Sequence, residues 1–490
     1  MDSNINEPNV FDRQSWGLPK EAVSDLAGRL RRIWSCFRDC FKTKTRDTSE
    51  NAWVYLRGLL TMETKRNYSN IVRRVVGLDE DGQDLQQFMS DSPWAGEKVF
   101  VQIQTEIQQR PELAGGMLTL DESGDECAGD QKAGAARQYL GRAGKVDLGQ
   151  VGVMVGYYQN EVWAMVGAEL YLPEVWFDPA HAELRKRWHI PAERTFATKP
   201  QLGLELIRQA RTNGLEFAVV GMDSLYGRDG QMRADLDAAH FGYMADIPAD
   251  TQVYRHLPVV GIPETPAGKQ GRPFSRPQVL NDVEPVQVRT LVGHPDFALR
   301  PLALRHTERG LLTYECAARR VWTLTPAAEV REEWLFLRKE TDGTFSFSLS
   351  NASSDTPLTQ LALWRCQRYF VERTFQDAKS EGGWDELVAR KYRAWTHHTA
   401  LDALALWFVA ETKLDWAKAH PRAPKLVQEL NIEVLPALSM SNVCELLKAV
   451  MPLNQLSPDE ATRLVIRHLV NRSNSTRSRL NAQRMIRGPT

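Results

Sequence analysis

The sequence predicts a mixed α/β protein with helical regions at both ends of the chain. Between Leu26 and Phe41, apolar residues recur every three or four positions, which is the spacing of one helix face. From residue 116 to residue 247, short apolar runs bounded by turn residues alternate with helical patterns, as expected for a mixed sheet. After residue 358 the helical spacing returns, so a second helical region is expected there.

The composition is that of a folded protein: 42% of the 490 residues are hydrophobic, 25% are charged, and the net charge is −1. These values exclude a chain that is disordered throughout and a fibrous repeat. No apolar run approaches the roughly 20 residues of a membrane span, and residues 1–9 lack the basic and apolar segments of a secretory signal. Six cysteines without a Cys-x-x-Cys pair argue against a disulfide scaffold, so we expect a reduced, cytoplasmic protein.

The N-terminal region is expected to continue as short helices at Ser49–Leu60, Glu63–Val76 and Gln83–Met89. Between Arg29 and Arg46 stand five arginines and two lysines against one acid. Two interpretations remain open for this region. It is either a module that reads DNA or a plain helical bundle with a solvated basic face.

Strands are expected next, and two of them end on an acid. Met117–Asp121 is a short apolar run, and Glu216–Asp223 is a buried strand followed by a turn. The other expected elements are strands at Val146–Tyr158, Glu161–Leu172 and Gly242–Ile247 and helices at Gln201–Thr212 and Gly230–Ala239.

A loop rich in proline and glycine at 258–278 separates these elements from further strands between Val286 and Leu349. Asp342-Gly343 lies between two β-rich runs and predicts a hairpin. One long helix is expected at Leu358–Ser380, followed by more helices to about residue 470. Residues 461–490 contain seven arginines and no acid, which suits either phosphate binding or a solvated tail.

Three carboxylates stand out by position: Asp121 and Asp223 at strand ends, and Glu372 on the long helix. Strand ends meet at one edge of a sheet, and a helix packed there can add a third carboxylate. Three such groups can hold one or two magnesium ions for an in-line phosphoryl displacement. Each acid alone is more often a solvent-facing residue.

Arg368, Glu372 and Lys379 follow one another at intervals of four and seven residues, which places them on one helix face. An isolated trio of this kind can be a set of surface ion pairs. However, this arrangement resembles the signature of bacterial cut-and-paste transposases with a DDE triad. Further blocks resemble the insertion sequence 701 family, a relative of the insertion sequence 4 group. These blocks are Asp121-Glu-Ser-Gly124, residues 141–152, residues 169–173, Thr198-Lys-Pro200 and residues 223–227.

The resemblance implies an RNase H-like catalytic core with a β-rich insertion before the final Glu. The expected division of the chain is a helical DNA-binding domain at 1–110, the first part of the core at 111–250, the insertion at 251–356, the Glu-bearing helix at 357–400 and a helical region with an Arg-rich tail at 401–490.

The resemblance also implies roles for single residues. Asp121, Asp223 and Glu372 are the expected catalytic metal ligands, with Mg²⁺ as the ion and Mn²⁺ as a substitute. Arg368 and Lys379 are expected to contact DNA phosphates.

At three positions the chain departs from the family pattern. Arg365 is also counted among the expected DNA contacts, but it stands where the family usually has a Tyr, so the role of that Tyr stays open. Glu122 and Asp125 depart from the pattern too, and they either tune metal affinity or have no role.

Five more residues are candidates for contact with DNA. Arg137, Arg142 and Lys145 are expected near the backbone, although solvated surface charges are nearly as common there. Trp322 and Trp334 lie in the insertion, where related transposases hold a flipped base on a Trp. A Trp in a strand is more often part of the core. His397-His398 is expected to be structural, because no third metal ligand is near in sequence.

The resulting hypothesis is a DNA transposase that cleaves transposon ends and transfers strands into target DNA. Its expected partners are double-stranded DNA and a second copy of the chain, with no membrane. Its expected location is the bacterial cytoplasm, in association with the nucleoid. Two alternatives remain: a non-catalytic or domesticated DNA-binding protein with a transposase fold, and a metal-dependent DNA nuclease.

Overall fold

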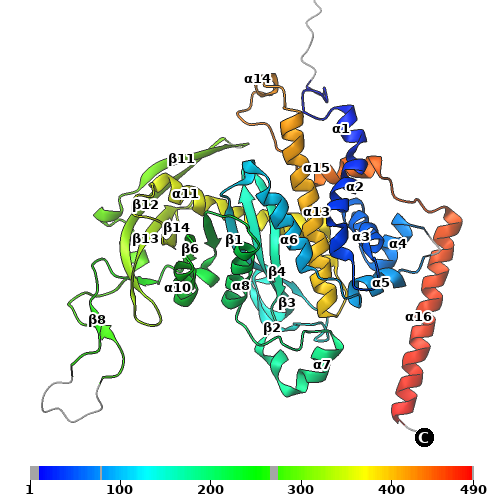
Figure 1. Ribbon diagram of the computed structural model, residues 1–490, viewed down its shortest axis with the longest axis horizontal. Coiled ribbons are helices and arrows are strands. Elements are labelled where there is room, and N and C mark those ends of the chain that lie inside the picture. Colours follow the sequence, from blue (N-terminus) through cyan, green and yellow to red (C-terminus); the bar gives the residue numbers. More distant parts are fainter. Residues whose placement is uncertain (1–9, 78–79, 265–273, 309, 488–490) are drawn as a thin grey trace, which may run out of the picture.

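The computed structural model describes residues 10–77, 80–264, 274–308 and 310–487, and it has one large sheet flanked by helices (Figure 1). The sheet has ten strands, with helical regions before and after it in the chain. The predicted fold class is therefore confirmed. In the part of the chain that the structure describes, no helix is long and apolar enough to span a membrane.

The centre of the sheet is strand β1 (Met117–Glu126). It pairs antiparallel with β3 (Lys145–Gln159) on one side and parallel with β5 (Val219–Met222) on the other. Strand β5 is parallel to β6 (Tyr243–Ile247), and β3 also pairs with β4 (Val162–Leu170). The strand order is therefore β4-β3-β1-β5-β6. Strand β3 is antiparallel to both of its neighbours, and β1, β5 and β6 are parallel to one another. This arrangement agrees with the expected RNase H-like core. Strand β2 (Ala136–Leu140) pairs with the start of β3.

The β-rich segment extends this same sheet. Strand β14 (Phe345–Ser350) pairs antiparallel with β6 and continues the sheet outward. The further strands in this direction are β13 (Val330–Lys339), β12 (Gly310–Leu324) and β11 (Arg300–Thr307). The predicted hairpin joins β13 to β14, and Gly343 has φ +85° in its turn, a conformation that glycine adopts readily. Two small two-stranded sheets pair β7 (Gln252–Val253) with β10 (Val286–Gln287) and β8 (Val260–Gly261) with β9 (Gln278–Val279).

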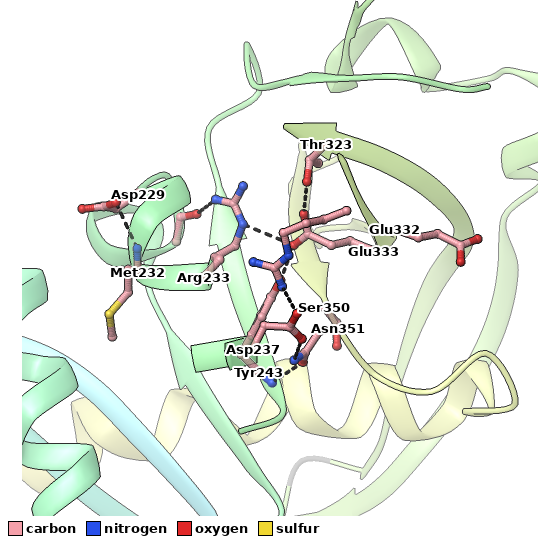
Figure 2. A network of polar contacts seen from close by, with 12 residues as sticks. Asp229, Met232, Arg233, Asp237, Tyr243, Thr323, Glu332, Glu333, Ser350 and Asn351 are labelled. Atoms are coloured by element: carbon pink, nitrogen blue, oxygen red, sulfur yellow. Dashed lines mark hydrogen bonds and ion pairs between the residues drawn. The ribbon is translucent and has the colours of Figure 1, made fainter. Parts of the chain in front are cut away.

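A buried polar network joins the added strands to the core (Figure 2). Glu333 on β13 is fully buried, and Arg233 on helix α10 (Gly230–Ala238) places Nε 3.2 Å from its carboxylate. The hydroxyl groups of Tyr243 and Thr323 donate hydrogen bonds to the same carboxylate. Because a buried charge is stable only when it is paired, this network fixes β12 and β13 relative to β6 and α10.

Helix α8 (Lys199–Thr212) packs on β3 and β4 of the core sheet, and helix α11 (Leu358–Gln367) packs on β11 and β12 of the extension. Helix α8 begins with a capping box at Thr198, which explains its sharp start. The remaining core helices are α7 (Ala182–Arg187) and α9 (Ser224–Gly227).

The two terminal regions pack against each other through helix α13 (Tyr392–Ala419), which is buried over most of its length. Its neighbours include α3, α5 and α6 from the N-terminal region and α15 from the C-terminal region. The N-terminal helices are α1 (Lys20–Ser24), α2 (Leu26–Phe37), α3 (Ser49–Thr61), α4 (Tyr68–Val75), α5 (Gln83–Ser90) and α6 (Glu97–Gln108). The C-terminal helices are α14 (Lys425–Glu429), α15 (Met440–Val450) and α16 (Pro458–Arg487), and α16 projects from the body of the protein (Figure 1).

The sequence-based boundaries of two elements were wrong by several residues. Strand β1 does not end at Asp121 but runs to Glu126, because β3 continues to pair with it. Helix α4 begins at Tyr68 instead of Glu63, because Asn67 caps it by accepting a hydrogen bond from the backbone N–H of Asn70.

The expected long helix at 358–380 is interrupted. It consists of α11 (Leu358–Gln367), α12 (Tyr369–Asp377) and a π-helical turn at Ala378–Gly382. The turn ends on Gly382, where a Cβ atom would lie 1.9 Å from Oδ1 of buried Asp402, so only glycine fits against α13.

Candidate active site

Asp121 and Asp223 lie next to each other at one edge of the sheet. The parallel pairing of β1 with β5 ends at Leu120 and Met222, and the two aspartates are the residues that follow these in the chain. The chain turns away after Asp223, because its carboxylate accepts hydrogen bonds from the backbone N–H groups of Leu225, at 2.9 Å, and Tyr226, at 3.3 Å. The side chain of Asp223 is therefore fixed as the N-cap of α9.

The charges at this edge repel one another. Burial and then the negative charge of Asp223 raise the pKa of Asp121 to about 8. Burial and then the charge of Glu122 raise the pKa of Asp223. Clustered carboxylates whose ionised forms are destabilised in this way suit a divalent cation, which prefers charged oxygen ligands. The donor set thus fits the expected metal, although the described residues contain no three His, Cys, Asp or Glu side chains already grouped around one point.

Arg368, at the junction of α11 and α12, connects three carboxylates. Its Nη1 lies 3.8 Å from Oδ2 of Asp121, and its Nη2 lies 3.4 Å from Oε1 of Glu372. Its Nε lies 3.0 Å from Oδ2 of Asp246. The structure therefore brings Arg368 to both Asp121 and Glu372. The side chain of Glu372 is 55% exposed.

Asp246 was missed by the sequence analysis. It lies on β6, is only 8% exposed, and accepts a hydrogen bond from Oγ of Ser348 at 2.7 Å. An acid inside the otherwise apolar run Tyr-Met-Ala-Asp-Ile was the available signal, because a buried carboxylate needs a partner.

Arg365, one of the expected DNA contacts, lies next to Asp246. Its Nε is 2.7 Å from Oδ1 of Asp246, and its side chain is buried. The ion pair with Asp246 explains this inward position.

Two lysines pair with the extra acids next to Asp121. Nζ of Lys379 lies 2.8 Å from Oδ1 of Asp125, and Nζ of Lys199 lies 3.1 Å from Oε1 of Glu122. Lys379 is thus at the site, on the π-helical turn after α12. Lys199, at the start of α8, adds a positive charge next to Glu122. In the sequence it stood out only as part of the Thr198-Lys-Pro200 block.

The other candidates for DNA contact come from β2, the turn after it, β3, β12 and β13. Arg137 is exposed on β2, and exposed Lys145 has Nζ 2.7 Å from Oδ2 of Asp147. The side chain of Arg142 lies outside the described residues. Trp334 is half-buried and donates from Nε1 to the carbonyl oxygen of Ser353 at 3.0 Å. Trp322 is also half-buried, and its backbone pairs with Tyr254.

The two histidines of α13 lie in the protein core. Both ring nitrogens of His397 contact backbone carbonyl oxygens, those of Met89 at 2.9 Å and Trp94 at 2.8 Å. Nδ1 of His398 lies 2.8 Å from the hydroxyl oxygen of Tyr55. These contacts support the expected structural role, since they connect α13 to the N-terminal helices.

Comparison with known proteins gives two matches. A family model for DDE superfamily endonucleases matches residues 36–311, which include Asp121 and Asp223 but not Glu372. A protein from Microchaete diplosiphon, described as a probable transposase for insertion sequence element IS701, is 30% identical over 211 residues. The match covers 42% of this chain and 50% of the relative, so the chain spans half the length of that protein. Both matches agree with the resemblance found in the sequence blocks.

Proposed function

The chain belongs to the DDE superfamily of endonucleases, and from this premise we propose that it is a DNA transposase that cuts at transposon ends and joins them to target DNA. The observation that supports this most strongly is the adjacency of Asp121 and Asp223 on parallel strands, with Arg368 connecting Asp121 to Glu372. The proposed substrates, the element ends and the target, are double-stranded DNA. Because the two ends of the element must be held together, the proposal includes a homodimer on DNA. The expected association with the nucleoid and the division into domains also remain proposals.

Asp121, Asp223 and Glu372 would hold Mg²⁺, or Mn²⁺ in its place. When bound, the cation would supply Lewis-acid polarisation of the phosphate and activation of a water molecule. The chain's own groups would position the scissile phosphodiester and stabilise charge on it. Arg368, Lys379 and Lys199 are cations at or beside these carboxylates, where they can offset negative charge on the phosphoryl oxygens.

The proposed reaction has two in-line displacements. Water attacks the phosphodiester at the element end, the P–O bond to the departing 3′ oxygen breaks, and a 3′-OH is released. That 3′ oxygen then attacks a target phosphodiester, loses its proton, and displaces a second 3′ oxygen. No protein nucleophile is needed, because both attacking groups are hydroxyl or water oxygens.

The proposal is tested with purified protein and DNA that carries the ends of its own element. Asp223→Asn and Glu372→Gln should bind these ends like the wild type and lose nicking by a factor of about a hundred or more. Asp130→Asn is the matched control, because it removes one carboxylate charge from an exposed loop residue after β1.

The products separate the three candidate functions. Joined products with Mg²⁺ or Mn²⁺ support a transposase, and nicks without joining favour the nuclease. End-specific binding without nicking by the wild type, with either ion, favours the DNA-binding protein.

A further inference from the structure

Beyond the proposed catalytic residues, one buried acid is shared by two arginines. Oδ1 of Asp246 lies 2.7 Å from Nε of Arg365, and Oδ2 lies 3.0 Å from Nε of Arg368. Ser348, its register partner on β14, donates a hydrogen bond from Oγ to Oδ1 at 2.7 Å. Each oxygen of this carboxylate therefore has its own cationic partner.

We propose that Asp246 is a positioning residue that holds the guanidinium of Arg368 beside the metal-binding carboxylates and prevents it from neutralising them. The inference rests on the proposed function, because it assumes that Asp121, Asp223 and Glu372 hold a divalent cation. It assigns a role to an acid outside the triad.

The contact distances rank the partners of Arg368. The contact with Asp246, at 3.0 Å, is shorter than those with Glu372, at 3.4 Å, and Asp121, at 3.8 Å. The attraction between opposite charges weakens with distance, so Asp246 is the strongest charge partner of this guanidinium. Nη2 donates a long hydrogen bond to Glu372, and Nη1 reaches Asp121 only at ion-pair distance.

Arg365 makes this anchor necessary. It is three residues before Arg368, its side chain is 10% exposed, and its nearest acid contact is Asp246. The side chain of Arg368 is 15% exposed, so two cations lie close together in a poorly hydrated region. Without Asp246 both would be buried charges without their principal counter-charge, which is strongly unfavourable.

The nearest alternative for Arg368 is the acidic edge of the sheet. Asp121 and Asp223 directly follow the paired residues Leu120 and Met222, and Glu122 is next to Asp121, so three acids gather there. A released guanidinium would move onto these acids and compete with the cation for their oxygens. Asp246 keeps the arginine near the site without placing it in the cation's position.

The direct test measures metal binding without DNA. Mn²⁺ is titrated calorimetrically into wild type and Asp246→Asn, an isosteric change that removes only the charge. The affinity of Asp246→Asn for Mn²⁺ should fall by about tenfold or more, as observed when groups that orient metal sites are removed. In the double variant Asp246→Asn with Arg368→Met the competing cation is absent, so Mn²⁺ affinity should return to within about threefold of wild type.

A control and a milder variant keep the test decisive. Glu333→Gln disrupts another buried pair with an arginine, so it should lower the melting temperature and leave Mn²⁺ affinity unchanged. Ser348→Ala keeps the charge of Asp246 and removes one hydrogen bond, so a smaller loss of affinity in the same direction is expected even if Asp246→Asn fails to fold.

Unchanged Mn²⁺ affinity in both the Asp246 and Ser348 variants would overturn the inference. A double variant that binds Mn²⁺ as weakly as Asp246→Asn would also overturn it. Failure of the proposed function is distinguishable from failure of this inference. A wild type that binds Mn²⁺ but cuts no DNA would contradict the proposed function, and the metal titrations of the variants would still test the role of Asp246.

Discussion

Lys379 and Asp125 form an ion pair, with Nζ 2.8 Å from Oδ1, that joins the π-helical turn after α12 to the end of strand β1. The extension of β1 beyond Asp121 makes this contact possible, because it carries Asp125 toward the lysine. Glu122 and Lys199 form the equivalent pair on the other extra acid. Both extra acids therefore have cationic partners, and in the proposed function each acid would limit how strongly its lysine binds phosphate.

The first prediction concerns this lysine. Lys379→Met should weaken binding to every DNA sequence and reduce the salt slope of log affinity by about 0.9, the value for one phosphate contact. Asp125→Asn should tighten binding, since it removes the acid that competes for Lys379. Fluorescence anisotropy over a salt series measures both, with Lys339→Met on β13 as the control. A slope that Lys379→Met leaves unchanged would exclude a phosphate contact.

The second prediction concerns Asp121 in the metal-free protein. Its pKa is raised from 3.8 to about 8 by burial and by Asp223, so the native state retains a proton that the unfolded state has lost. Stability from this group is thus complete below about pH 4 and is lost as the pH rises to about 8.

Thermal unfolding across this range checks the sign. From pH 5 to pH 8 the melting temperature of wild type should fall relative to that of Asp121→Asn by at least about 3 °C, the shift that roughly 1 kcal/mol produces in a large domain. Mn²⁺ should remove this difference by replacing the proton. Parallel curves for the two proteins without metal would contradict it.

Much of the site could be predicted from the sequence, because local rules apply to it. Asp121 and Asp223 each follow an apolar strand, and parallel pairing places such positions at the same edge. The interval from Arg368 to Glu372 implies a shared helix face, and the two side chains do form a contact despite the break at Arg368.

What could not be predicted depends on partners far apart in the sequence. Asp246 and Arg365 belong to a strand and a helix separated by the whole inserted segment, so no local pattern indicates that they pair. The π-helical turn depends on the contact of Gly382 with Asp402 of α13, which is equally remote. The pairing of β14 with β6 likewise depends on tertiary packing, because the alternating pattern of a strand does not specify its neighbour in the sheet.

The third prediction concerns acid stability. Burial lowers the pKa values of His397 and His398 to about 4, so both are neutral in the native state. The unfolded residues gain protons below about pH 6.5, and stability is lost as the pH falls from there to about 4.

At pH 5 the expected loss is roughly 2 kcal/mol for each histidine, from 1.36 kcal/mol per pKa unit. Urea unfolding at pH 7.5 and pH 5 should show a smaller loss in His398→Gln than in wild type. The exposed His306→Gln, the control, should follow the wild type. The contribution of Asp121 to stability changes with pH in the opposite direction. The two effects are therefore separated by comparing wild type with Asp121→Asn for one and with His398→Gln for the other.

The fourth prediction compares two neighbouring acids of β13. Glu333 is fully buried among Arg233, Tyr243 and Thr323 (Figure 2), whereas Glu332 is exposed and pairs with Arg320. Glu333→Gln should lower the free energy of unfolding by about 3 kcal/mol, because it leaves a buried guanidinium without its charge partner. Glu332→Gln should change it by no more than about 0.5 kcal/mol. Equal effects of the two changes would show that the buried network does not hold the added strands.

The last prediction concerns α16, the helix that projects from the body (Figure 1). Almost all of its described side chains from Ala461 to Asn481 are exposed, and the segment from Ala461 onward contains seven arginines and no acid. An isolated helix without a buried face is only marginally stable in water, and phosphates would supply the missing counter-charges.

A chain that ends at Ser457 should therefore keep its melting temperature, since the removed residues of α16 bury little, and bind DNA more weakly with a shallower salt slope. Changing Arg472, Arg477 and Arg479 together to Gln tests the charge without shortening the chain. It should reduce the slope by up to about 2.7, or about 0.9 for each phosphate that an arginine no longer neutralises. A truncated protein that melts earlier but binds DNA equally well would instead mean that α16 packs on protein.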